Sequence, residues 1–396
     1  MKRLPLGLIA ILLCASCTGD DPEPVDPSET TDPADPSETT DPSDPSEVTQ
    51  ATKTLAVATY NMGLAPGYVP YAAERRDPVV AAVATSTADV ICLQEVWFDE
   101  DREYVLSQLA DSYPHQYSQF EEVESGGDPA CTPDEGAPLM ECATAAECDS
   151  ATDLGNCVLT NCVTEYSALG PDCQQCLAAN LGLGNMDDIF VACTSGSTEW
   201  LYEGRHGAVL LSKQPMTNTQ LIPLNSWLIV RPALYAEVDG AQILCTHMST
   251  ELGVDYGGDF ESYEAEHKDQ LDTLIAAMDT NNLGGPQIIS GDFNAGPAVG
   301  DLSGEWAENY SALDAAGYAD ANCAADVPFC TWCEANLISN DPVNSAIDHI
   351  MVRQASTSAP QRLYDGSVTI ESETDGTVEV SLSDHFGMQV DVTWEE

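Results

Sequence analysis

One segment in the C-terminal half constrains this chain most: Gln287-Ile288-Ile289-Ser290-Gly291-Asp292-Phe293-Asn294, an apolar run that stops at a carboxylate and an amide. Alternate side chains of a strand share a face, so Asp292 and Asn294 would lie together at the carboxyl edge of a sheet, where α/β proteins keep their sites. A carboxylate can bind a hard cation, and an amide can donate to a phosphoryl oxygen. Taken alone, the segment also fits an ordinary capped turn.

Other apolar segments end in the same kinds of side chain. With the first segment they form a set of six strand ends: Asn61, Glu95, His247, Asp292 with Asn294, Asp348, and Asp384 with His385. Packing explains one such residue but not six, so the set predicts a functional site. The set contains two histidines together with several carboxylates and amides, and the chain has no serine or cysteine nucleophile motif. This combination suits metal-assisted attack of water on a phosphoester.

The rest of the sheet-forming sequence predicts two packed sheets with helices outside them. Helical signals cover residues 77–84, 99–110 and 263–278, the first beginning at the pair Asp77-Pro78 and the second capped by Asp99. Asp239-Gly240 marks a tight hairpin between two strands. Many strands, hairpin turns and few helices between them favour a two-sheet sandwich.

Seven short motifs carry a family resemblance. They are, in chain order, Thr59-Tyr60-Asn61, Leu93-Gln94-Glu95, Gly207-Ala208-Val209-Leu210-Leu211-Ser212, Thr246-His247, Gly291-Asp292-Phe293-Asn294, Ile347-Asp348 and Ser383-Asp384-His385. The set resembles the endonuclease/exonuclease/phosphatase superfamily over about residues 54–396. The resemblance, which excludes the cysteine-rich stretch, implies an α/β fold: a four-layer α/β/β/α sandwich of two mostly antiparallel sheets flanked by helices. The cysteines add a disulfide-rich insertion to this fold. The resemblance also implies a phosphodiesterase that needs Mg2+ or another divalent cation such as Mn2+.

The same resemblance implies which residues bind the metal and which move the proton. Glu95 resembles the principal metal ligand, with Asn61 and Asp384 beside it in the site. His385 resembles the general base that takes a proton from the attacking water, and Asp348 would hold and polarise it.

Three further residues receive roles from the resemblance. His247 matches a second histidine, which contacts the phosphate or assists the leaving oxygen. Asp292 would orient the nucleophile or a water on the metal, and Asn294 would donate to a phosphoryl oxygen. His349 follows Asp348 and should point to the opposite face of its strand, which predicts a structural role.

Loop motifs favour a phospholipid substrate. Gln94-Glu95-Val96-Trp97 and residues 113–117 and 203–213 look most like neutral and bacterial sphingomyelinases, and Thr331-Trp332 resembles a motif of that branch. The net charge of −54 would repel a polyanion, whereas a zwitterionic phosphocholine head group tolerates it. Tyr256, Phe260 or Tyr263 could meet the quaternary ammonium. An extracellular DNase-like endonuclease and a surface-anchored binding protein remain as alternatives.

The N-terminus predicts export. Residues 1–17 combine Lys2 and Arg3 with an apolar run and end in a lipobox-like Cys17, which predicts a lipid anchor in a membrane or, failing that, a secreted protein. Residues 18–53 repeat an acidic Pro/Ser/Thr motif and predict a disordered linker. Residues 54–396 would form the enzyme domain, which is predicted to be a monomer.

Cysteines predict a cross-linked insertion at residues 121–200. Eight of them fall in this stretch, which has few large apolar residues and should depend on disulfides instead of a core of its own. A zinc site at Cys173 and Cys176 is the competing interpretation. Cys323, Cys330 and Cys333 would close a smaller loop. Cys92 and Cys245 lie in apolar strands, so we expect them to be free and buried.

Overall fold

The computed structural model describes residues 51–118, 128–151, 154–196, 200–252, 254–339 and 341–395. The predicted export signal, its lipobox-like Cys17 and almost all of the predicted linker lie outside the described residues. The first strand begins at Thr52, so the folded part starts two residues before the predicted boundary.

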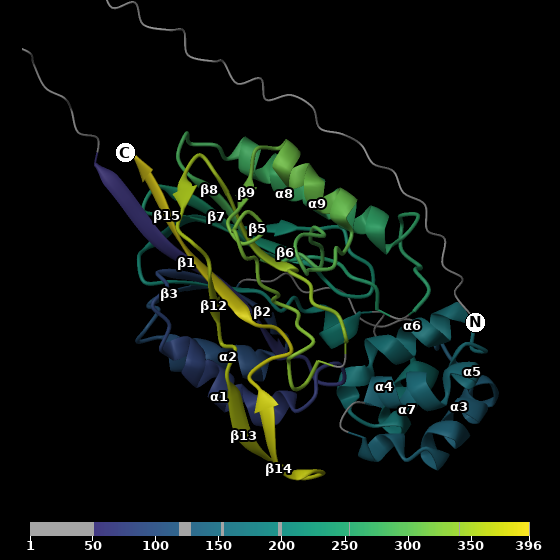
Figure 1. Ribbon diagram of the computed structural model, residues 1–396. Helices are drawn as coiled ribbons and strands as arrows, with labels where there is room; N and C mark the ends of the chain where they lie inside the picture. Colours follow the sequence, from purple (N-terminus) through teal and green to yellow (C-terminus); the bar gives the residue numbers. More distant parts are fainter. Residues whose placement is uncertain are drawn as a thin grey trace, which may run out of the picture. The chain divides into compact units, whose positions relative to one another are not determined.

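Two large sheets form the centre of the molecule (Figure 1). The first has the strand order β11-β15-β1-β2-β4-β3, with β12 also paired to β15, and only β1 and β2 run parallel. Its strands are β1 (Thr52–Leu64), β2 (Val90–Val96), β3 (His115–Tyr117), β4 (Val209–Ser212), β11 (Ser356–Thr357), β12 (Gln361–Leu363) and β15 (Gly387–Glu395).

The second sheet has the order β5-β6-β7-β8-β10-β9, with β7 and β8 as its parallel pair. Its strands are β5 (Met216–Pro223), β6 (Pro232–Val238), β7 (Ala241–His247), β8 (Gln287–Asp292), β9 (Ala319–Asp320) and β10 (Asp348–Arg353). The predicted hairpin at Asp239-Gly240 joins β6 to β7. A separate hairpin consists of β13 (Ser367–Ser372) and β14 (Gly376–Ser381).

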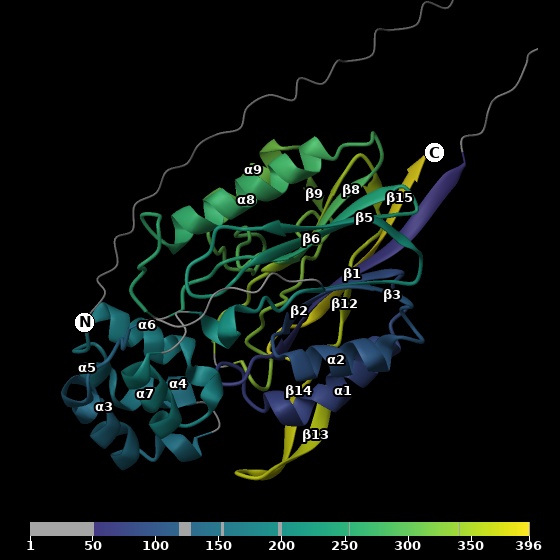
Figure 2. The ribbon, with the colours of Figure 1, turned by 180° about the vertical axis from the view of Figure 1, so that it is seen from behind.

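Helices cover the outer face of each sheet (Figures 1 and 2). Helices α1 (Ala72–Ala84) and α2 (Asp99–Leu109) pack on the first sheet, whereas α8 (Tyr263–Thr280) and α9 (Ala307–Ala315) pack on the second. A third apolar cluster lies between the two sheets. The predicted four-layer sandwich is therefore confirmed.

Helix α1 starts earlier than its sequence signal. It begins at Ala72, so Pro78 lies inside it and Asp77 is not its cap. Arg75 in its first turn is fully buried and donates to the carbonyl oxygens of Met62, Gly63 and Leu382. This tertiary anchoring supports the extra turn, which the local sequence does not indicate.

A disulfide between Cys92 and Cys245 joins the two sheets. Cys92 of β2 and Cys245 of β7 both point into the cluster between the sheets, because alternate residues of each strand face that cluster. The prediction that both cysteines are free was wrong. Their position in apolar strands indicated their burial, but only the stacking of the sheets brings the two sulfur atoms together.

Removing this cross-link should destabilise the protein strongly. Its cysteines are 153 residues apart, and the loop-entropy relation gives a loss of about 5 kcal/mol in the free energy of unfolding for the Cys92→Ala/Cys245→Ala variant. Cys330→Ala/Cys333→Ala is the matched control, since its cysteines are three residues apart and the same relation gives roughly 1.5 kcal/mol. Denaturant unfolding measures both values. Equal losses in the two variants would contradict the expectation.

The cysteine-rich insertion is a set of short helices. They are α3 (Pro133–Ala145), η1 (Cys148–Ser150), α4 (Leu154–Asn161), α5 (Val163–Tyr166), α6 (Pro171–Ala179), η2 (Leu181–Leu183) and α7 (Met186–Ser195), with η3 (Leu201–Gly204) leading back to the sheets. The disulfides are Cys131–Cys173, Cys142–Cys162, Cys148–Cys157 and Cys176–Cys193. Cys173 and Cys176 are each in a disulfide, so the zinc alternative was wrong.

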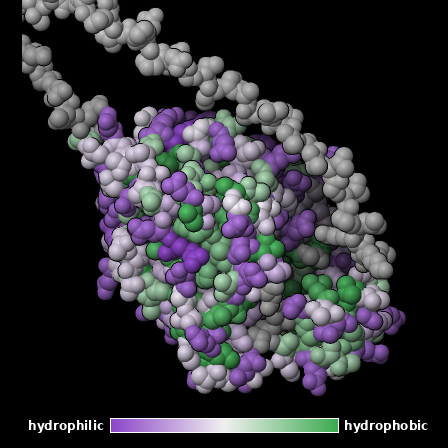
Figure 3. Space-filling view, in the orientation of Figure 1, coloured by the Kyte–Doolittle hydropathy of each residue, from purple (hydrophilic) through white to green (hydrophobic). Residues whose placement is uncertain are grey.

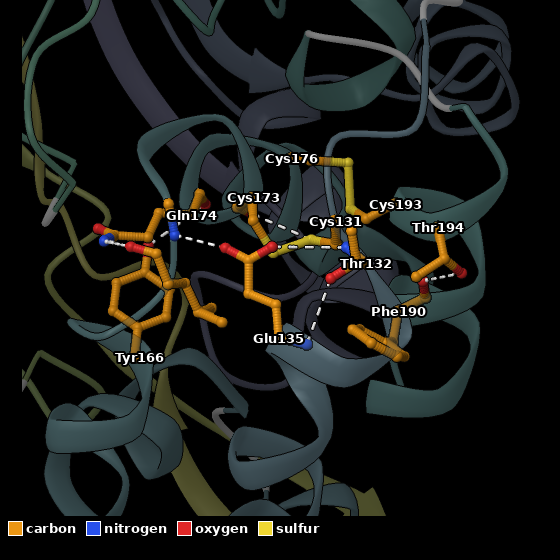
Figure 4. The surroundings of a disulfide bond; sticks show 12 residues. Cys131, Thr132, Glu135, Tyr166, Cys173, Gln174, Cys176, Phe190, Cys193 and Thr194 are labelled. Carbon is orange, nitrogen blue, oxygen red and sulfur yellow. Dashed lines mark hydrogen bonds between the residues drawn. A yellow bond between two sulfur atoms is a disulfide. The ribbon is translucent and has the colours of Figure 1, made fainter.

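The insertion also has an apolar cluster of its own, contrary to expectation. Leu139, Val158, Leu177 and Ile189 are buried in it together with the disulfides, which add apolar volume that a count of large side chains omits. Figure 4 shows how α3 is fixed: Glu135 forms a capping box with Thr132, and its other carboxylate oxygen accepts from the Gly170 amide at 2.6 Å.

The described part of the chain holds one further disulfide, Cys330–Cys333, and leaves Cys323 unpaired. The predicted small loop therefore closes with two of its three cysteines. Among the described helices, none combines the length and the apolar character needed to cross a membrane.

Candidate active site

One edge of the two sheets gathers all eight predicted site residues. Asn61, Glu95, His247 and Asp292 lie near the carboxyl ends of β1, β2, β7 and β8. Three residues predicted at strand ends differ: Asp348 is the first residue of β10, and Asp384 and His385 lie between β14 and β15, just before β15 begins. Since β10 runs antiparallel to β8, Asp348 pairs with Asp292 and still reaches the same edge.

His385 and Asp348 form a hydrogen-bonded pair. Nδ1 of His385 lies 2.8 Å from Oδ2 of Asp348, while its Nε2 faces Asp292 at 3.8 Å. Burial favours the neutral ring, but the charges of Asp348 and Asp292 outweigh it and raise the pKa of His385 well above its usual value. The geometry leaves Nε2 as the nitrogen that can exchange a proton in the cavity.

The side chains of Thr331 and Trp332 hold this pair in place. Thr331 accepts hydrogen bonds at its hydroxyl from the amides of Ile347 and Asp348, each at 3.1 Å. Trp332 packs edge-on against the His385 ring, with centroids 4.9 Å apart. The Thr331-Trp332 motif thus orients both members of the pair.

Glu95, Asn61 and Asp384 provide oxygen donors beside the pair. Oε2 of Glu95 is buried without a hydrogen-bond partner, and Glu95 has a left-handed backbone with φ of 60°. Burial and then repulsion by Asp384 raise the pKa of Glu95 to about 7. An unpartnered carboxylate oxygen, repelled by a second carboxylate, is what a hard divalent cation would relieve. These residues therefore fit Mg2+ or Mn2+.

Asp292 lies next to several of the other predicted site residues. Its Oδ2 accepts from the side-chain Nδ2 of Asn61 at 2.9 Å and lies 3.5 Å from Nε2 of His247. Its Oδ1 accepts from the backbone N–H of Asn294 at 2.9 Å. Burial and then Asp348 raise the pKa of Asp292 to about 6. The fixed carboxylate lies between both histidines and can orient a water molecule there.

His247 is neutral in this environment. Burial, together with the positive charge of Arg231, holds its pKa well below the usual value. Its Nδ1 is buried without a hydrogen-bond partner. A neutral imidazole at this point can donate a hydrogen bond to a phosphate or leaving oxygen.

Asn294 is turned partly toward the protein. Its side-chain Nδ2 donates to the carbonyl oxygen of Met248 at 2.9 Å, so only its second N–H remains for a ligand. The backbone of Asn294 is left-handed, with φ of 49°. Its predicted contact with a phosphoryl oxygen is thus limited to one hydrogen bond.

Arg231 is a candidate site residue that sequence reasoning missed. It precedes β6, its side chain is 3% exposed, and Nη1 has no hydrogen-bond partner. Its guanidinium lies 5.9 Å from the centroid of the Trp97 ring. A buried cation among carboxylates suits a phosphate oxygen. The available signal was an arginine opening an apolar strand in a chain with only 12 Lys and Arg.

His349 takes no part in this edge. Its Nδ1 lies 2.5 Å from Asp320 and its Nε2 lies 2.8 Å from the Ala295 carbonyl oxygen. Asp320 overcomes the effect of burial and raises the pKa of His349 well above its usual value. Asp320, Cys323 and His349 have the residue types of a metal site. Both ring nitrogens are already used, so the cluster is a structural ion pair, as the sequence predicted for His349.

A cavity of about 800 Å3 opens beside the edge of the sheets that holds the predicted site residues, which we call the catalytic edge. Glu95, Arg231, His247 and His385 are among the residues that line it. The aromatic residues expected to meet a choline group lie elsewhere. Tyr256 and Tyr263 pack against each other and against Trp227, and neither they nor Phe260 line the cavity.

Comparison with known proteins gives one family and several similar folds. The model of the Endonuclease/Exonuclease/phosphatase family matches residues 58–385. Sphingomyelinase C from Streptomyces griseocarneus is 18% identical, with a TM-score of 0.50 over 86% of this chain and 99% of that one. An endonuclease/exonuclease/phosphatase family protein from Bacteroides thetaiotaomicron is 14% identical, with a TM-score of 0.50 over 87% and 100%. Curated protein sequences give no match.

Proposed function

Because this chain belongs to the endonuclease/exonuclease/phosphatase family, we propose that it is a metal-dependent phosphodiesterase that hydrolyses a phospholipid head group, as a sphingomyelinase does. The observation that carries the proposal is the His385–Asp348 pair, whose free Nε2 faces the cavity beside Asp292. A base, a group that orients water and oxygen donors for a cation all meet at this point.

The residues of the pair would activate water. In its neutral form, which a cation held by Glu95 would favour against the raised pKa of His385, the His385 ring would take a proton from a water molecule that Asp292 orients, and Asp348 would stabilise the resulting imidazolium. The oxygen of this water forms a bond to phosphorus while the bond from phosphorus to the lipid oxygen breaks, and that oxygen takes up a proton from solvent to become the lipid alcohol. The products are the lipid alcohol and a phosphomonoester of the head group.

Glu95, Asn61 and Asp384 would hold Mg2+ or Mn2+. The ion supplies positive charge that offsets the negative charge on the phosphoryl oxygens. The family and the oxygen donors support a divalent cation, and the small octahedral Mg2+ suits a site with few carboxylates.

Hydrogen-bond donors at the second sheet, one cationic and two neutral, would position the phosphate. Arg231 and one N–H of Asn294 can bind phosphoryl oxygens, and the neutral His247 can donate to the leaving oxygen. These three residues lie on or next to strands of the second sheet, opposite Glu95 on the first.

The charge of the protein supports a lipid in preference to nucleic acid. A net charge of −54 repels a polyanion, and Arg231 is the one Lys or Arg among the described residues that line the cavity, whereas binding DNA depends on many surface cations. The six disulfides among the described residues support an oxidising compartment outside the cell, and a lipid on Cys17 remains a prediction.

A paired assay tests the choice of substrate. With Mg2+, one purified preparation should release phosphocholine from sphingomyelin vesicles and leave linear DNA intact. DNA cleavage without lipid hydrolysis would support the DNase-like alternative and contradict the proposal. Vesicle binding without hydrolysis of either substrate would support a surface binding protein.

A further inference from the structure

The cavity beside the catalytic edge continues into the cysteine-rich insertion. Its volume of about 800 Å3 is bounded at one end by the carboxylates and histidines described above. The other end is lined by side chains from four insertion helices, α3, α4, α6 and α7: Leu139, Val158, Leu159, Leu177, Met186 and Ile189. The candidate site and the insertion therefore line the same cavity.

The insertion end of the cavity is apolar. Among the described insertion residues that line it, none is charged, although the chain has 66 Asp and Glu, and Asn156 is the one amide side chain. The hydroxyl of Tyr166, also in this lining, donates to the Gln174 carbonyl oxygen. Tyr68, Trp97 and Tyr202 lie along the path toward the catalytic edge. A wall without charges in so acidic a protein is suited to a hydrocarbon and unsuited to a polar ligand.

Disulfides hold this wall in place. They connect the start of α3 to α6, the end of α3 to the start of α5, η1 to α4, and α6 to α7 (Figure 4 shows the first and the last). The Tyr68 hydroxyl also donates to the Ala178 carbonyl oxygen at 2.8 Å. Cross-linked helices keep their separation without closing the hollow. Apolar side chains that face an open cavity lack van der Waals contacts on that side, and a bound ligand would supply them.

We propose that the insertion is the chain-binding half of the active site and receives an aliphatic chain of the phosphodiester substrate. The inference rests on the proposed phosphodiesterase function, because the phosphate of the same molecule would lie at the catalytic edge. Pockets for whole small ligands measure about 300–1,000 Å3. A small head group with its phosphate would fill only the polar end of this cavity and leave its apolar end for the chain.

Chain length provides the first test. The full chain is titrated with hexylphosphocholine and decylphosphocholine below their micelle concentrations, in the presence of a chelator, and binding is measured by calorimetry. A buried methylene strengthens binding about threefold to fourfold, so the decyl compound should bind at least tenfold more tightly. Equal affinities for the two compounds would overturn the proposal.

A matched pair of insertion variants provides the second test. Leu159 lines the cavity and is 43% exposed, whereas Val191 is 60% exposed and does not line it. Figure 3 shows hydrophobic side chains at the surface of the insertion, at the lower right of the view. Leu159→Asp should weaken decylphosphocholine binding at least tenfold, and Val191→Asp should leave it unchanged. Equal weakening by both would overturn the proposal.

A substrate without an aliphatic chain separates this inference from the proposed function. The wild type with Mg2+ should hydrolyse 4-nitrophenylphosphocholine whether or not the insertion binds an aliphatic chain. Absence of hydrolysis together with chain-length dependence would reject the phosphodiesterase and keep the chain site. Hydrolysis without any chain-length dependence would reject the chain site and keep the phosphodiesterase.

Discussion

Replacing His385 by alanine is expected to lower kcat for phosphodiester hydrolysis by about 10²- to 10⁴-fold. The reason is geometric: Asp348 holds Nδ1 at 2.8 Å, and Nε2 is left facing the cavity as the base for the attacking water. Initial rates with 4-nitrophenylphosphocholine at saturating Mg2+ measure the effect. Added imidazole should restore part of the rate, because a small base can enter the space that the side chain leaves.

His115→Ala is the control for this substitution. His115 lies in β3, an edge strand of the first sheet, and is half-buried outside the site. It should keep its full rate. Asp348→Asn should lower the rate less than His385→Ala, because the base remains but loses its charged partner. A His385→Ala protein that is folded and fully active would reject His385 as the base.

Replacing Glu95 by glutamine should abolish activity at ordinary Mg2+ concentrations and weaken Mg2+ binding at least 100-fold. Even residues that only support a metal ligand contribute about 10–100-fold to affinity, so the loss of a charged ligand should exceed that range. Mg2+ titrations followed by activity and by calorimetry measure the two effects. In the wild type, a chelator should remove the activity and added Mg2+ should restore it.

The same variant should gain stability when no metal is present. Burial and Asp384 raise the pKa of Glu95 to about 7, so its ionised form destabilises the folded state, increasingly as the pH rises from 4.5 through 7. Glutamine removes that charge, and the melting temperature in chelator at pH 8 should rise. Glu100→Gln, on the exposed face of α2, should change neither metal affinity nor stability. A lower melting temperature for Glu95→Gln would contradict this account.

Apolar runs that end in polar side chains made much of the site readable from sequence. Asn61, Glu95, His247 and Asp292 each follow an apolar run, and each lies near the end of a strand at one edge of the sheets. Burial is continuous over most of β2, β7 and β8, so the local signal is an unbroken apolar run and not an alternating pattern. Roles taken from family resemblance for these residues remain proposals.

Other parts of the site depend on contacts that no local pattern encodes. Asp348 begins its strand and reaches the edge only because β10 runs antiparallel to β8. Arginine is usually a surface residue, and Arg231 is buried because tertiary packing places its guanidinium 5.9 Å from the centroid of the Trp97 ring. Neither the order of strands in a sheet nor the facing of two sheets can be deduced from periodicity.

The sequence by itself determined the sandwich of two sheets, the polar edge and the presence of a cysteine-rich insertion. Tertiary structure alone decided that Cys92 bonds to Cys245 and that the insertion opens an apolar hollow onto His385. The physical reason is the range of the interactions. Apolar runs and strand ends are set by neighbours along the chain. A cross-link and a cavity depend on the positions of segments more than a hundred residues apart in the folded protein.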